Sequence, residues 1–215
     1  TLSFVHVGKN FASGCTKLQT CMLSATAKYI GETAFAGCSS LNVFQVPTSP
    51  DLVIVHDQSS NPFQGCKNIV FNGYEYDGFY DGISQAKYQV KDGACYELVQ
   101  DSDRINLVHM GKDSLMANIP TDRTVYASAY SMEYRTEKDI VVPSNVVFNG
   151  NRIFTQSNGD SITLTRLLGD SYCQYLFAET NYGKNYTFAA GETLIPDNCF
   201  ANISNSKFTS LEIPE

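Results

Sequence analysis

The run Ile30-Gly31-Glu32-Thr33-Ala34-Phe35-Ala36-Gly37-Cys38-Ser39-Ser40-Leu41, closed by Val46-Pro47, carries the strongest structural signal in this chain of 215 residues. An earlier copy starts at Val7, 23 residues before it. A third copy, Phe63-Gln64-Gly65-Cys66, is displaced by 28 residues, so five residues are inserted ahead of it. Near the C-terminus, Ile195 to Phe200 and Phe208 to Pro214 restate both halves of the motif. Internal repeats of roughly 20 to 50 residues indicate a solenoid or a similar array.

The second half of the motif has the pattern of a short strand. Phe44 and Val46 lie two positions apart, which places both side chains on one face. Pro47 has no N–H to donate and therefore ends the strand ladder. The glycines mark turns, and Phe35 can pack beneath the next coil. Since one such unit cannot bury its apolar side alone but a stack can, the repeat predicts a mainly β solenoid.

Two runs of the sequence resemble the BspA-like (Treponema-type) leucine-rich repeat. They are Ile30 to Leu41 with Val46-Pro47, and Ile195 to Phe200 with Leu211-Glu212-Ile213-Pro214. The resemblance covers residues 1–72 and 187–215, and Cys199 replaces the usual alanine. It implies a leucine-rich-repeat solenoid. It also implies a protein that is secreted or anchored at a microbial cell surface, where it mediates adhesion or contacts a host or matrix.

The middle of the chain contains a second internal repeat, whose two copies are offset by 57 residues. Asp92-Gly93 is followed by Ile105-Asn106-Leu107-Val108, and Asn149-Gly150 is followed by Ile162-Thr163-Leu164-Thr165. Asp-Gly and Asn-Gly between apolar runs favour two-residue hairpin turns, because both turn residues need a positive φ. The alternating segments are typical of half-buried strands. We therefore expect two equivalent β-hairpins.

Other segments of the middle look like weakened copies of the repeat. Ile119-Pro120 and Ile140-Val141-Val142-Pro143 again place proline after an apolar strand, and Val125 to Tyr130 resembles the turn of Ile30 to Phe35. We interpret residues 73–186 as divergent repeats broken by β-hairpins, between leucine-rich repeats at 1–72 and a terminal repeat at 187–215. The alternative is a small β domain inserted between two solenoid pieces.

The composition is that of a folded protein and narrows the class of partner. Hydrophobic residues make up 43%, charged residues 17%, and the net charge is -7. Nucleic acid binding needs a basic face, so nucleic acid is not an expected partner. An anionic membrane surface is also disfavoured as a partner, and no run of about 18 apolar residues predicts insertion of this segment into a membrane.

Because the chain starts at Thr1 rather than Met, we expect it to be part of a longer polypeptide. We also expect a monomer.

The seven cysteines are odd in number and scattered, which predicts free thiols rather than disulfides. No CxxC pair or cysteine and histidine cluster has the spacing of a zinc site. Cys15, Cys38 and Cys66 occupy one repeat phase. We therefore expect these three thiols to form an inward-facing stack.

No motif for catalysis or for a cofactor stands out. Phosphate-binding glycine loops, Gly-x-Ser-x-Gly and His-Glu-x-x-His are absent, and His6, His56 and His109 fall at different repeat phases. Asp101-Ser102-Asp103 and Asn158-Gly159-Asp160 offer oxygen ligands for calcium. They are also ordinary turn residues, and the twelve-residue calcium pattern ending in glutamate is missing. We expect no enzyme activity, no cofactor and no metal site.

Two groups of residues are candidates for contact with a ligand. The first is an aromatic stretch that can stack on sugars or anchor a partner, or that caps the first repeat block. The second is a row of non-core strand positions that stacking would align on one face. The aromatic stretch is Tyr74, Tyr76, Phe79 and Tyr80, and the row is Gln19, Met22, Asn42, Gln45 and Glu212.

Three functions are compatible with these observations. The leading hypothesis is a non-catalytic, surface-exposed module that binds a protein or glycan at a cell surface or matrix. The second is a structural spacer within a larger cell-surface protein. The third is a hydrolase in residues 73–186, which would need a deep pocket with paired carboxylates.

Overall fold

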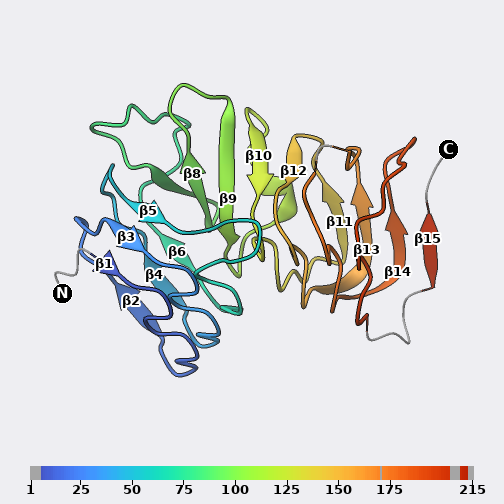
Figure 1. Cartoon of the computed structure of the whole chain (residues 1–215), viewed down its shortest axis with the longest axis horizontal. Helices are drawn as coiled ribbons and strands as arrows, with labels where there is room; N and C mark the ends of the chain where they lie inside the picture. The colour runs from blue at the N-terminus through green and yellow to red at the C-terminus, as the bar shows by residue number, and fades with distance from the viewer. Residues whose placement is uncertain (1–5, 170, 204–208, 213–215) are drawn as a thin grey trace.

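The chain forms a mainly β solenoid in which successive coils follow one another along the long axis of the molecule (Figure 1). The computed structural model describes residues 6–169, 171–203 and 209–212. No helix in these ranges is long and apolar enough to cross a membrane. The elements are β1 (His6–Val7), β2 (Thr20–Met22), β3 (Tyr29–Ile30), β4 (Val43–Gln45), β5 (Val53–Ile54), β6 (Phe71–Asn72), β7 (Tyr88–Lys91), β8 (Ala94–Leu98), β9 (Arg104–Met110), the 3₁₀ helix η1 (Met116–Asn118), β10 (Thr124–Ala127), β11 (Asp139–Val142), β12 (Val146–Phe148), β13 (Asn158–Leu164), β14 (Asn181–Thr187) and β15 (Ser210–Glu212).

The first three coils confirm the predicted repeat. Strands β1, β3 and β5 form one parallel sheet, and β2, β4 and β6 form another. Cys21, Phe44 and Phe71 are register partners, so equivalent side chains of successive coils meet inside the stack. The rings of Phe35 and Phe63 stack with their centroids 6.0 Å apart. The stacked aromatic column expected from the Ala-Phe step is therefore present.

One of the two predicted hairpins is present. Strands β7 and β8 pair antiparallel across Asp92 and Gly93, which have φ values of 47° and 75°. β8 then pairs antiparallel with β9, and from β9 the chain returns to parallel coils in the sheet order β12-β10-β9-β8-β7. The hairpin thus interrupts the solenoid without ending it, as expected for a middle region of divergent repeats with an inserted hairpin. The division of the chain at residues 72 and 187 stays a prediction.

The second predicted hairpin, at Asn149-Gly150, was wrong. β12 and β13 lie in different sheets, so the two segments that repeat at an offset of 57 residues are not equivalent structural units. Gly150 instead lies against the neighbouring coil, where an added Cβ would be 2.1 Å from the Ala129 nitrogen. Gly31 is similar, because its Cβ would be 2.6 Å from the Lys9 nitrogen. Glycine is needed here for the close approach of two backbones.

Two smaller expectations need correction. Ile119 does not end a strand but follows η1, which packs beside β11. The turn after β10 begins two residues later than its sequence pattern indicated. Tyr130 has a φ of 56° and Thr33 has a φ of 52°, so these two residues are equivalent. The buried Met132, two residues after Tyr130, therefore takes the place of Phe35.

Of the terminal repeat, Phe208, Ile213 and Pro214 lie outside the described residues.

All seven cysteines are free thiols, as predicted. Cys38 and Cys66 are buried and each donates to a carbonyl of the preceding coil, at 3.1 Å. Cys15 is exposed, so the predicted stack holds for two of its three members. Cys15 belongs to the first described coil, and no preceding described coil covers its thiol.

Buried polar residues join the third coil to the coils after the hairpin. His109 lies beside Phe63 and Phe71, with ring centroids 6.2 and 6.1 Å away. Arg135 is buried and donates to the carbonyl oxygens of Gly111 and Ser114, at 3.0 and 2.7 Å. Arg135 stands five residues after Tyr130, as Cys38 stands five residues after Thr33, so a buried arginine replaces the buried cysteine at this place in the coil.

Candidate binding surface

Four of the five residues in the predicted strand row lie as two neighbouring pairs on adjacent coils. Met22 and Gln45 are register partners in the sheet of β2, β4 and β6, and Met22 is 62% exposed. Asn42 donates its backbone N–H to the carbonyl of Gln19 at 2.9 Å. Glu212 lies elsewhere, in β15 of the sheet formed by β11, β13, β14 and β15. The structure thus brings Gln19 beside Asn42 and Met22 beside Gln45 but separates Glu212 from them.

The aromatic stretch after the third repeat is partly committed to packing. Tyr76 and Tyr80 are half-buried against the core of the later coils. Their hydroxyls donate to a carboxylate oxygen of Asp122, at 3.1 Å, and to the Pro50 carbonyl, at 2.9 Å. Tyr74 and Phe79 are exposed. Only two of the four rings are therefore available to a ligand.

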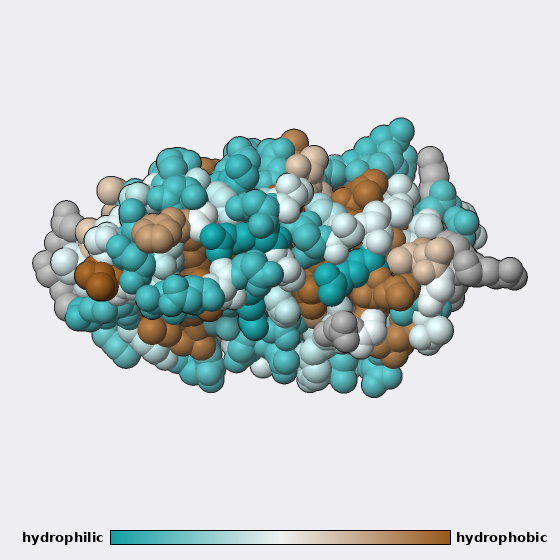
Figure 2. Space-filling model, turned by 90° about the horizontal axis from the view of Figure 1, so that it is seen from above, coloured by the Kyte–Doolittle hydropathy of each residue, from teal (hydrophilic) through white to brown (hydrophobic). Residues whose placement is uncertain are grey.

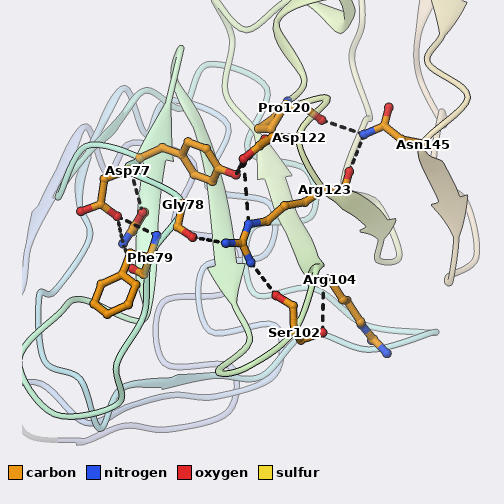
Figure 3. Close-up of polar contacts among 11 residues, drawn as sticks. Asp77, Gly78, Phe79, Ser102, Arg104, Pro120, Asp122, Arg123 and Asn145 are labelled. Atoms are coloured by element: carbon orange, nitrogen blue, oxygen red, sulfur yellow. Dashed lines mark hydrogen bonds and ion pairs between the residues drawn. The ribbon is translucent and has the colours of Figure 1, made fainter.

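A polar clamp holds this stretch on the following coils (Figure 3). The Arg123 guanidinium donates to the carbonyl oxygens of Gly78 and Ser102. The Asn145 side chain then donates to the carbonyls of Pro120 and Arg123, both at 2.7 Å. Four segments far apart in the sequence are fixed together in this way.

Exposed apolar residues are scattered in the part of the chain that the structure describes. Seen from above, a hydrophilic band separates hydrophobic patches (Figure 2). Large continuous apolar patches mark protein interfaces, whereas single exposed apolar residues are normal on a folded protein. A candidate surface therefore has to be found from its chemistry and geometry.

The turns between strands show a regular backbone feature that the sequence pattern did not reveal. Residues with positive φ recur in successive turns, four positions apart. In the first turns the second member is glycine; in later turns it is not. The pairs are Asn10 and Gly14, Thr33 and Gly37, Tyr130 and Tyr134, Arg152 and Gln156, Tyr175 and Glu179, and Asn198 and Asn202, with Gly65 at the second place in the third coil.

Holding a side chain in this left-handed conformation costs about 1 kcal/mol per residue, whereas glycine adopts it freely. Coil-to-coil hydrogen bonds keep the later turns in place. The N–H groups of Tyr130, Arg152 and Tyr175 donate to carbonyls of the next coil, at 3.2, 3.0 and 3.0 Å. Strained backbone of this kind clusters at functional sites. The six side chains therefore define a candidate surface, which we call the turn patch: Tyr130, Tyr134, Arg152, Gln156, Tyr175 and Glu179.

Contacts within the turn patch align its polar groups. Arg152 Nη1 lies 2.6 Å from Glu179 Oε1, and the Arg152 guanidinium lies over the Tyr175 ring, 4.8 Å from its centroid. Gln156 Nε2 donates to the other Glu179 oxygen at 2.9 Å. This hydrogen bond and the nearby Arg152 hold the pKa of Glu179 below its usual range. The guanidinium, amide and carboxylate are thus fixed before any ligand arrives.

The turn patch borders a groove of about 310 Å³. Gly37 and Gly65 lie on one side of it, and Tyr130, Tyr134 and Arg152 are among the other lining residues. The two glycines add no side chains to the groove, while the two tyrosines supply aromatic walls. The only sequence signal for this groove is the loss of glycine at the turn position of Gly14, Gly37 and Gly65.

Glu133 forms a buried wall of the same groove, with 3% of its surface exposed. Its carboxyl group accepts the Gly65 N–H. The corresponding N–H groups of Gly14 and Gly37 donate to backbone carbonyls instead. Burial raises the pKa of Glu133 to about 8, although the Gly65 hydrogen bond and the charge of Arg135 oppose the rise. Glu133 is therefore mostly uncharged at neutral pH.

Most of the five-residue insertion ahead of the third repeat falls after β5, where the chain forms a strap that we define as residues 55–60. After β5 it runs across towards β10 (Figure 1). The carbonyls of Asp57 and Gln58 accept the N–H groups of Ala129 and Asn151, at 3.0 and 2.8 Å. The strap thus ties the third coil to two later coils.

His56 of the strap lies between Ser128 and Glu97, in the residue order of a hydrolase triad. Nδ1 is 3.0 Å from Ser128 Oγ, and Nε2 is 3.1 Å from Glu97 Oε2. Burial alone would raise the pKa of Glu97, but the hydrogen bonds and charges of His56 and Lys87 hold it well below its usual range.

The hydrogen bonds do not suit a nucleophilic serine. Ser128 Oγ donates its single proton to the Leu107 carbonyl at 2.6 Å, so it accepts from His56 Nδ1. The Glu97 carboxylate accepts from Nε2. The Ser128 hydroxyl proton therefore points away from His56, which cannot take it from there as a general base must. His56 anchors the strap.

The calcium candidates differ from one another in the structure. Residues 101–103 form the turn between β8 and β9, whereas 158–160 begin β13. In the described ranges, no group of three histidine, cysteine, aspartate or glutamate residues is arranged to hold a metal ion.

Comparison with known proteins gives a family match over most of the chain. A model of the BspA type leucine rich repeat region matches residues 3–72 and 121–215, with six copies. Among solved structures, a leucine-rich repeat protein from Bacteroides ovatus is similar, with 15% identity and a TM-score of 0.37, over 98% of this chain and 67% of that one. The search of curated protein sequences gives no significant match. The hairpin of β7 and β8 lies outside the matched residues.

Proposed function

Because the chain belongs to the BspA-type leucine-rich-repeat family, we propose that it is a non-catalytic module that binds a protein or glycan through the turn patch. BspA-type repeats are typical of surface proteins, and the repeat fold is generally non-catalytic. The proposal therefore includes a cell-surface or extracellular location and a role in adhesion. Stacked repeats present extended, rigid surfaces on which such contacts are made.

One observation carries this proposal: Tyr134, Gln156 and Glu179 occupy left-handed positions at which the first three coils use glycine. With the first positions of the same turns, they make a patch that holds three tyrosines and an arginine, and both residue types are enriched among the residues that dominate binding energies. Arg152 is already oriented by Glu179 and Tyr175. Binding to such a surface loses little side-chain freedom.

The test uses a variant with Tyr134→Gly, Gln156→Gly and Glu179→Gly, which restores the glycine of the early coils. The wild-type chain should bind saturably to at least one member of an array of immobilised matrix proteins and glycans. The triple variant should bind that ligand at least about 30-fold more weakly, or about 2 kcal/mol. The matched control is Asn202→Gly, at the same turn position outside the turn patch, which should bind like the wild type.

Two outcomes would count against the turn patch. One is the absence of saturable binding across the array. The other is binding that survives in the triple variant but is lost on Gln45→Ala, which would move the contact to the strand row of Gln19, Met22, Asn42 and Gln45.

A further inference from the structure

A second, smaller pocket lies outside the turn patch. It has a volume of about 100 Å³ and is partly open to solvent. Arg104 and Asn106 of β9, Tyr126 of β10, Glu97 of β8 and His56 of the strap line it. The alternation of β9 turns Ile105 and Leu107 into the core and leaves Arg104 and Asn106 on the other face.

Arg104 is held in place but does not use all its donors. Its guanidinium lies over the Tyr126 ring, 4.0 Å from the centroid, and Nε donates to Asn106 Oδ1 at 2.9 Å. The two Nη atoms make no hydrogen bond to any described residue. Figure 3 shows this side chain directed away from the clamp that surrounds Arg123. Stacking and the Nε bond fix a planar fork that still has free N–H groups.

The carboxylates of the pocket already have partners. Glu97 accepts hydrogen bonds from His56, Lys87 and Asn106, at 3.1, 2.7 and 2.6 Å. Oδ1 of Asp57 accepts the N–H groups of Ser59 and Ser60, each at 2.8 Å.

Glu97 is also paired with the Lys87 ammonium. The Arg104 guanidinium, by contrast, forms no ion pair with a carboxylate of the described residues. In a chain of net charge -7, the pocket therefore presents an unpaired guanidinium.

We propose that this pocket binds the carboxylate of an aspartate or glutamate side chain from a partner polypeptide. The planar fork of Arg104 matches a carboxylate in a two-pronged hydrogen bond. The small, partly open pocket admits a carboxylate on a short stem. Because Glu97 and Asp57 also line it, a singly charged carboxylate is favoured over a more highly charged phosphate. This contact is independent of the turn patch.

The experiment is an NMR titration of the whole ¹⁵N-labelled chain with the capped peptide acetyl-Gly-Glu-Gly-amide. Saturable shifts are expected for the amides of Asn106 and Tyr126, and not with the matched peptide that carries glutamine. Arg104→Gln should weaken binding at least about tenfold. Arg104→Lys should weaken it about threefold or more, because lysine keeps the charge but loses the fork. Arg166→Gln, with the same change of charge on a later coil, should stay within about twofold of the wild type.

Several results would overturn the proposal. They are an absence of saturable shifts, an equal response to the glutamine peptide, or unchanged affinity of Arg104→Gln with the wild-type pattern of other amide peaks. Tighter binding of inorganic phosphate or of galacturonic acid at the same amides would overturn the assignment to an acidic side chain.

Discussion

Gly150→Ala should lower the free energy of unfolding by about 4 kcal/mol, whereas Gly8→Ala should change it by less than about 1 kcal/mol. A Cβ on Gly150 would lie 2.1 Å from the Ala129 nitrogen and 2.5 Å from the Ser128 carbonyl carbon. Both contacts are with backbone, so relief requires two coils to move apart. At Gly8, the same place in the first coil, a Cβ would meet no atom within 4 Å.

The measurement is denaturant unfolding of the two variants and the wild type. Gly31→Ala is an informative third variant, because its Cβ would lie 2.6 Å from the Lys9 nitrogen, and we expect a loss of stability between the other two. Equal losses for Gly8→Ala and Gly150→Ala would show that the coils do not stack backbone against backbone.

Between about pH 5 and pH 9, the wild type should lose about 4 kcal/mol of stability relative to Glu133→Gln. The folded-state pKa of Glu133, about 8, lies above its ordinary value of 4.5, because the carboxyl group is buried. The folded chain therefore holds this proton more tightly than the unfolded chain does. The resulting stabilisation is complete below pH 4.5 and is lost as the pH rises through 8.

This prediction is checked by unfolding both proteins at pH 5, 7 and 9 and comparing the differences. Glutamine keeps an acceptor for the Gly65 N–H but does not ionise. Groups that titrate in both proteins, such as Glu97, cancel in the comparison. A difference that stays constant from pH 5 to pH 9 would mean that Glu133 is ionised in the folded chain at neutral pH.

Sequence reasoning succeeded where the signal is local. The repeated Gly-Cys and Val-Pro steps predicted the first three coils, and Asp92-Gly93 predicted the hairpin of β7 and β8. It failed at Asn149-Gly150, which carries the same kind of dipeptide. Whether such a pair turns the chain back or fits beneath a neighbouring coil depends on Ala129, which is distant in sequence.

The candidate surface was largely invisible in the sequence. The pairing of Gln19 with Asn42 and of Met22 with Gln45 followed from the 23-residue repeat, and the structure places the two members of each pair side by side. The turn patch could not be predicted from the sequence, because a sequence indicates a left-handed backbone position only where that position holds glycine. The insertion that forms most of the strap was detected, but the contacts of the strap with Ala129 and Asn151 depend on the packing of later coils.

The most direct test of this account is the free energy of unfolding of the variant with Tyr134→Gly, Gln156→Gly and Glu179→Gly. We infer that these side chains are present for the surface they form. Removing them should relieve about 1 kcal/mol of backbone strain at each position. This relief offsets the loss of the half-buried packing of Tyr134 and Glu179 and of the hydrogen bonds of Gln156 and Glu179. The variant should stay within about 1 kcal/mol of the wild type. A decrease of more than about 3 kcal/mol would show that the turn patch serves the fold.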